Sequence, residues 1–152
     1  MLFLRAAMIT TKNSEKDSWL EISHVDTVPT TAQKSARGFG SMCSALMSDI
    51  QSAKGSGATA LKAIRNIESG IETYIEADGN AHIAFITAHE VWFGCLYVDI
   101  DESSVSFRQY KLAVETWVRF LADPARKPIV IPFPDDVLDR AALPPRPPRN
   151  EE

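Results

Sequence analysis

The 152-residue sequence lacks the short motifs that identify most enzymes and cofactor-binding proteins. It contains neither the GxxxxGK[ST] phosphate loop nor the GxSxG nucleophile motif. The GFG and GSG triplets do not match the glycine spacing of either motif. Its three histidines and two cysteines form no HxxxH or CxxC pair, so no set of zinc ligands is gathered locally. We therefore expect no cofactor and no metal site.

Cysteine and long apolar runs are also scarce. Cys43 and Cys95 lie in unrelated contexts, which predicts free thiols and a cytoplasmic location. No window of about 18 apolar residues could cross a bilayer. The apolar residues before Arg5 fall short of the roughly 7 to 15 that a secretory signal needs. The sequence thus predicts a protein with no membrane partner.

The net charge of -4 is unevenly distributed along the chain. Residues 1–70 carry 8 Lys/Arg against 6 Asp/Glu, whereas residues 71–143 carry 6 against 12. An acidic surface repels phosphate, so we expect no nucleic-acid partner and favour a basic protein partner. No particular oligomeric state is predicted.

With 45% hydrophobic and 24% charged residues, the chain has the composition of one globular domain. We expect a flexible N-terminal lead over 1–17, a single α+β domain over 18–143 and a proline-rich, disordered tail over 144–152. The expected architecture is a pair of N-terminal helices packed on a mostly antiparallel sheet, with a long C-terminal amphipathic helix and a short edge strand.

In the first half, residues 18–25 have the composition of a strand, and residues 30–54 have apolar side chains at helical spacing. Gly38 and Gly40 weaken the start of this helix, so it begins late or bends. A second helix follows the GSG triplet and ends at Gly70.

In the second half, strand-like segments at 72–77, 81–87 and 91–100 predict an antiparallel meander. Residues 91–98 are apolar on both parities, which is typical of a strand covered on both faces. An aromatic stripe from Phe107 through Trp117 to Leu121 predicts a helix, although 104–108 could instead form a short strand pairing with 97–100. Prolines confine residues 127–134 to a sheet edge.

One constellation raises an enzymatic hypothesis. If the second hairpin turns on Ala88 and His89, His82 lies opposite Cys95. A three-residue loop over 78–80 would add Glu76 to this row, and Cys95, His82 and Glu76 would then have the composition of an activated thiolate. The commoner two-residue turn replaces Glu76 by Ile75. A buried cysteine beside a neutral histidine is therefore the favoured interpretation, and an enzyme using Cys95 and His82 the alternative.

Acidic side chains gather near the ends of the last predicted strands and helix. The residues of this acidic cluster are Asp99, Asp101, Glu102, Asp123, Asp135, Asp136 and Asp139. Carboxylates around an aromatic anchor such as Trp92 or Tyr97 suit a fast-binding inhibitor of a basic protein. The leading hypothesis is a small, acidic, non-enzymatic protein of the immunity or antitoxin type that neutralises a basic toxin. An ordinary acidic surface is the competing interpretation.

The tail supplies a third hypothesis. Pro144, Pro147 and Arg149 have PxxPxR spacing, which suits the aromatic groove of an SH3-like domain. The chain would then be an adaptor that binds such a domain through its tail. A solvated tail without a partner is the competing interpretation.

Overall fold

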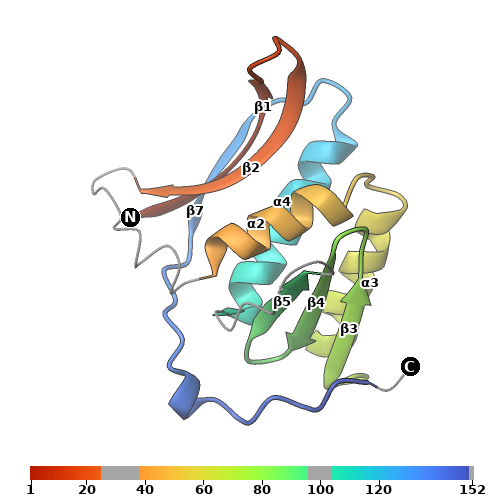
Figure 1. The fold of residues 1–152 in the computed structure, drawn as a ribbon, viewed down its shortest axis with the longest axis vertical. Helices are drawn as coiled ribbons and strands as arrows, with labels where there is room; N and C mark the ends of the chain where they lie inside the picture. The colour runs from red at the N-terminus through yellow and green to blue at the C-terminus, as the bar shows by residue number, and fades with distance from the viewer. Residues whose placement is uncertain (25–37, 96–103, 151–152) are drawn as a thin grey trace.

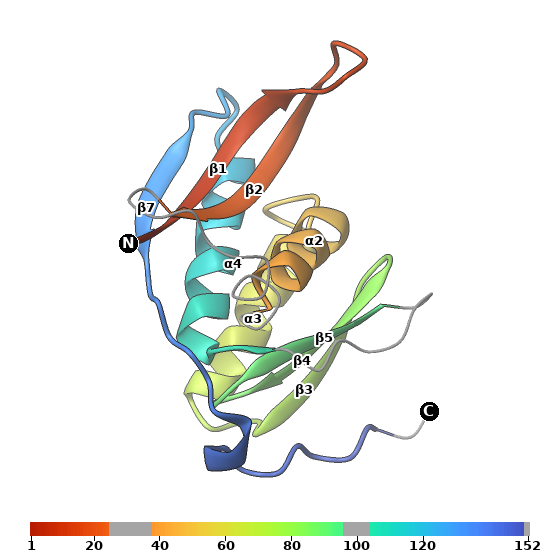
Figure 2. The ribbon, with the colours of Figure 1, turned by 60° about the vertical axis from the view of Figure 1, so that its left-hand side comes forward.

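A computed structural model describes residues 1–24, 38–95 and 104–150 of the chain (Figure 1). Within these residues the fold is α+β, with three α-helices and two antiparallel sheets. The helices lie between the sheets, as Figures 1 and 2 both show. The α+β class agrees with the sequence, but the expected arrangement of helices on one sheet is wrong because a second sheet covers their other side.

The first sheet contains β1 (Leu2–Thr10), β2 (Lys16–His24) and β7 (Ile129–Phe133), in the order β2-β1-β7. β1 is its central strand and pairs antiparallel with both neighbours. Alternate residues of β1 are buried toward the helices, among them Leu2, Leu4 and Ala6. Residues 2–10, expected to belong to a flexible lead, therefore form the middle of a sheet. Pro132 lies on β7 at the edge of this sheet, where a missing backbone N–H is tolerated.

The helix layer contains α2 (Phe39–Asp49), α3 (Ser56–Glu68) and α4 (Phe107–Ala122). α2 begins directly after Gly38, whose φ of 67° lies in the left-handed region. Residues 30–37 of the predicted helix lie outside the described residues. Gly70 follows α3 with a φ of 76°, at the helix end where the sequence placed it. Ser106 and Gln109 form a capping box at the start of α4. α4 does not close the chain, because β7 follows it and completes the first sheet.

The second sheet contains β3 (Tyr74–Asp78), β4 (His82–Thr87), β5 (Val91–Cys95) and β6 (Ser104–Val105), in sequence order. Its inner face presents Ile86, Val91 and Phe93 to the helices. β6 pairs with Val91 and Trp92 at the start of β5. Residues 97–100, the alternative partner considered for 104–108, lie outside the described residues. The remainder of the predicted third strand, from residue 96, lies outside the described residues.

The chain next reaches the outer face of the second sheet. After β7 it forms the 3₁₀ turn η1 (Arg140–Ala142), and residues 144–150 then run across β5, β4 and β3 (Figure 2). The sequence predicts a disordered tail here, and in the structure these residues contact the sheet. The second sheet is therefore covered by helices on one face and by the tail on the other.

Candidate functional site

The structure confirms the predicted pairing of His82 with Cys95 across β4 and β5. Glu76 is not part of that row, because it lies opposite Phe85 in the β3–β4 register. Both registers considered for this hairpin are wrong. The cause lies in α2: the Asp49 carboxylate accepts the Ala81 N–H at 3.0 Å. This contact holds a longer loop between the strands against the end of the helix.

Asp49 also replaces Glu76 as the carboxylate nearest His82. The distance from His82 Nδ1 to Asp49 Oδ2 is 3.7 Å, which is longer than a hydrogen bond. Nδ1 is buried without a hydrogen-bond partner. Cys95 is half-buried beside it. Asp49, His82 and Cys95 are thus neighbours, but the geometry is not that of a hydrogen-bonded catalytic triad.

The described members of the acidic cluster mostly serve local structure. Asp123 accepts backbone N–H groups of residues 125 and 127, and Asp139 caps η1. Asp136 binds Arg108 and accepts the Ser106 hydroxyl at 2.7 Å. Asp135 is exposed. Asp99, Asp101 and Glu102 lie outside the described residues.

Hydrogen bonds explain the acidity of two of these groups. The Arg108 guanidinium, followed by the Ser106 hydroxyl, lowers the pKa of Asp136, against the opposing effect of burial. Backbone N–H groups after α4 lower the pKa of Asp123. Both carboxylates therefore already have partners within the chain.

A different site lies on the outer face of the second sheet. Strand alternation places Tyr74, Phe85 and Trp92 there, and we call these three residues the aromatic strip. Trp92 stacks on Phe85 at a centroid distance of 5.4 Å and on Tyr74 at 6.2 Å. The strip forms a continuous π surface across β3, β4 and β5.

Two arginines of the tail lie on the aromatic strip. The Arg146 guanidinium carbon is 4.4 Å from the centroid of Trp92, and that of Arg149 is 5.3 Å from the centroid of Phe85. Both distances are within the range of cation–π attraction, about 6 Å. The tail therefore uses its cations, rather than apolar side chains, to cover the strip.

Each of these arginines also contacts a carboxylate. Arg146 Nε donates to Glu90 at 3.1 Å, and Arg149 Nε lies 3.9 Å from Glu76. Arg140 of η1 binds the same Glu90 carboxylate. Glu90 is only 3% exposed and Glu76 is 11% exposed in the side chain, so both charges are largely removed from water.

The pKa values at the site follow from these contacts. Burial would raise the pKa of Glu90, but hydrogen bonds from Arg146 and Ser104 and the charges of Arg146 and Arg140 outweigh it and lower the pKa. Burial, with a hydrogen bond to Glu76 at 2.8 Å, raises the pKa of Tyr74. Near neutral pH the Glu90 carboxylate is therefore charged and Tyr74 is a neutral donor.

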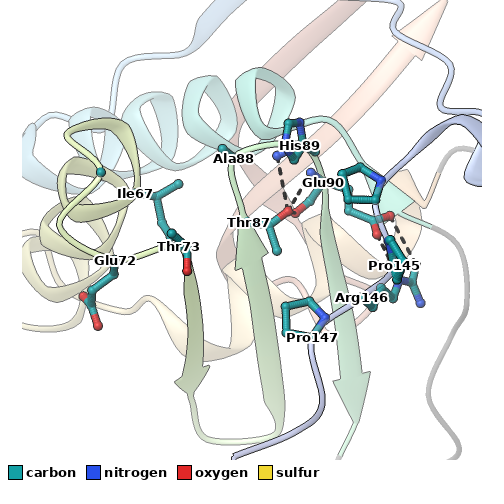
Figure 3. Close-up of a pocket in the computed structure, with 12 residues that line it drawn as sticks. Ile67, Glu72, Thr73, Thr87, Ala88, His89, Glu90, Pro145, Arg146 and Pro147 are labelled. Atoms are coloured by element: carbon teal, nitrogen blue, oxygen red, sulfur yellow. Dashed lines mark hydrogen bonds and ion pairs between the residues drawn. The ribbon is translucent and has the colours of Figure 1, made fainter.

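A cavity of about 320 Å³ lies beside the tail, between it and the end of α3. Its walls are residues 144–147 and the β4–β5 turn from Thr87 to Glu90, with Ile67 and Glu72 opposite (Figure 3). Arg146 reaches across to Glu90 at one side of this cavity, and His89 is exposed at the turn. The tail thus does not fill all the space available on this side of the sheet.

Sequence reasoning considered Trp92 only as a possible anchor and Glu76 only as a partner of His82, and it missed Glu90. One signal was present: the apolar residues on both parities of β5 required a cover on each face. The sequence did not indicate that the tail is the second cover, because the tail is composed mainly of prolines and arginines.

Comparison with protein families, with curated proteins and with solved structures found no match to the chain. Among residues 1–24, 38–95 and 104–150, no helix combines the length and apolar character needed to cross a bilayer. The same residues contain no cluster of three or more His, Cys, Asp or Glu side chains that could hold a metal ion.

Proposed function

We propose that this protein is a protein-binding module that recognises an extended, proline-rich basic segment on the outer face of its second sheet. The observation that carries the proposal is the placement of Arg146, which lies over Trp92 and donates to the buried Glu90. Aromatic rings flanked by carboxylates are how proline-rich, basic segments are bound elsewhere. The chain's own proline-rich, basic tail lies on this face, which supports the proposal.

The proposal keeps the expected basic partner but moves its binding site. Glu76 and Glu90, with the aromatic strip, replace the acidic cluster as the groups that receive positive charge. An immunity- or antitoxin-type inhibitor is one form that such a protein could take, since a basic toxin can supply the arginines. The adaptor hypothesis is reversed: the PxxPxR segment is the ligand already bound, and the sheet is the groove.

The test uses the full-length chain with its tail weakened by Arg146→Gln and Arg149→Gln. A fluorescent peptide with the sequence of residues 144–150, PPRPPRN, is titrated into this double variant and into the wild-type chain, and anisotropy is measured. We expect the double variant to bind the peptide at least about tenfold more tightly, because a tethered tail has an effective concentration in the millimolar range.

The matched control is the double variant Arg119→Gln and Lys127→Gln, which loses the same charge at exposed positions away from the tail. It should bind like the wild-type chain. Absence of peptide binding by the Arg146→Gln, Arg149→Gln variant, with its circular dichroism unchanged, would refute the proposed function.

A further inference from the structure

We infer that the outer face of the second sheet binds a polyproline II segment of another protein and recognises two arginines spaced three residues apart in that segment. This inference rests on the proposed function and specifies its ligand. Two groups of side chains on this face indicate the chemistry of the ligand. Each group, which we call a cell, consists of one aromatic ring and one carboxylate that together bind one arginine. Cell 1 is Trp92 with Glu90, and cell 2 is Phe85 with Glu76.

The two cells are built alike. In cell 1 the guanidinium of Arg146 lies 4.4 Å from the ring centroid and donates to the carboxylate at 3.1 Å. In cell 2 the guanidinium of Arg149 lies 5.3 Å from the ring centroid and Nε is 3.9 Å from the carboxylate. In cell 1, ring stacking combined with a charged hydrogen bond is an environment that favours a planar guanidinium over an ammonium group, and in cell 2 the ring contact is combined with an ion pair at a longer distance.

The two cells are occupied by arginines three residues apart in the chain. The rings that receive them, Trp92 and Phe85, lie opposite each other on adjacent strands, with centroids 5.4 Å apart. The carboxylates lie farther out, Glu90 directly before β5 and Glu76 on β3, on either side of β4. Three residues of polyproline II cover about 9.3 Å and return a side chain to the same side of the helix. An arginine three residues after the first thus faces the sheet again.

The prolines between the arginines serve this geometry. Residues 144, 145, 147 and 148 are all proline, which favours polyproline II and supplies no backbone N–H that would need a partner in the sheet. A preformed helix also loses little conformational entropy when it binds. A flexible segment with the same two arginines would bind more weakly.

The chain's own tail satisfies this specificity and so acts as a built-in competitor. Arg149 is 58% exposed in its side chain, whereas Arg146 is 22% exposed. Cell 2 is thus the more open of the two. A partner segment can engage cell 2 first and then displace Arg146 from cell 1.

The experiment compares three peptides on the full-length Arg146→Gln, Arg149→Gln variant. The first is PPRPPRN, the second has lysine in place of both arginines, and the third, PPRPRPN, has the same composition with the arginines two residues apart. We expect the first to bind at least about tenfold more tightly than either of the others, because an ammonium group lacks the planar stacking and donor fork of a guanidinium, and because the altered spacing takes one arginine out of its cell.

A second comparison tests cell 2 by itself. Glu76→Gln, added to the same variant, should weaken binding of PPRPPRN by about threefold or more and weaken binding of PPRPPQN less, because both peptides keep the Asn150 N–H that donates to Glu76 and only the first has an arginine for that cell. Equal weakening of both peptides would assign Glu76 a structural role and overturn the two-cell reading.

The outcomes separate the two proposals. Equal binding of the three peptides would overturn the proposed specificity for two arginines three residues apart and would leave the proposed function intact. Binding of none of the peptides would refute both proposals. Concentration-dependent dimerisation of the wild-type chain, abolished by Arg146→Gln and Arg149→Gln, would assign the site to the tail of a second copy and overturn its assignment to another protein.

Discussion

The indole N–H of Trp117 donates to the backbone carbonyl of Ile50 at 2.9 Å and so joins α4 to the end of α2. Trp117 is buried, and its ring stacks on Phe120 at 5.6 Å. The side chain therefore combines core packing with a hydrogen bond to a buried carbonyl at the junction of two helices.

Truncation of Trp117 should be among the most costly single changes in this chain. We expect Trp117→Ala to reduce the free energy of unfolding by about 3–5 kcal/mol, through lost burial and an unsatisfied carbonyl. Glu115→Ala, two residues away on the exposed side of α4, should change it by less than about 0.5 kcal/mol. Urea denaturation of both variants provides the measurement, and equal costs would contradict the packing.

The helix that carries Trp117 was predicted correctly because its signal, the apolar stripe, is local in the sequence. The glycine that ends α3 is also a local signal, and it was predicted for the same reason. The β4–β5 hairpin has a short turn, so its register followed from the sequence. The β3–β4 register did not, because the Asp49 carboxylate that holds its loop comes from 32 residues earlier in the chain.

β1 and the tail were missed for related reasons. β1 contains two adjacent alanines and apolar residues on both parities, which weaken the alternation that marks a half-buried strand. The tail has the composition of a disordered segment, and its arginines gain partners only once three strands have brought two rings and two carboxylates together. Both depend on contacts that no local pattern encodes.

Asp135 and Asp136 offer a direct test of what the acidic cluster does. Asp136 binds Arg108 and the Ser106 cap of α4, whereas Asp135 is exposed. We expect Asp136→Asn to destabilise the fold by about 1–2 kcal/mol, as for loss of a helix cap, and Asp135→Asn to be neutral. Thermal unfolding of the two variants distinguishes them. If neither change matters, the Asp136 contacts do not stabilise the helix.

The stability of the tail contact should depend on pH through Glu90. Its pKa is lower in the folded chain than in the unfolded chain, so it stabilises the fold above its ordinary pKa of about 4.3, and this contribution is lost as pH falls through the lowered folded value. Glu90→Gln should cost about 1–3 kcal/mol at neutral pH. The cost should shrink toward zero in acid.

The measurement for Glu90 is a series of denaturant titrations from pH 7 to pH 3 on the wild-type chain and on Glu90→Gln. Glu115→Gln, an exposed carboxylate on α4, is the control. A pH dependence that is the same in all three proteins would show that the ion pairs of Glu90 do not contribute to folding.

The two thiols should react at different rates. Cys43 is buried, and burial followed by the charge of Glu21 raises the pKa of Cys43 to about 12. Cys95 is half-buried, so an alkylating agent should modify it first in the native chain. Mass spectrometry after timed iodoacetamide treatment follows both. Faster modification of Cys43 would contradict its position in the core.

His82→Ala provides a further test within this measurement. Because Nδ1 of His82 makes no hydrogen bond and the Asp49 contact is long, we expect the alkylation rate of Cys95 to change by less than about threefold. A large fall in rate near neutral pH would show that His82 activates the thiol and would favour the enzymatic alternative.

The tail follows the second sheet in the sequence, and this order has a consequence for the newly made protein. The strands that carry the aromatic strip end at residue 95, and Arg149 is added 54 residues later. At about 5–20 residues per second, translation leaves a gap of roughly 3 to 11 s between them. During that time the nascent sheet has no cover of its own on its outer face. A partner segment present at the ribosome would meet the groove before the competing tail has been synthesised.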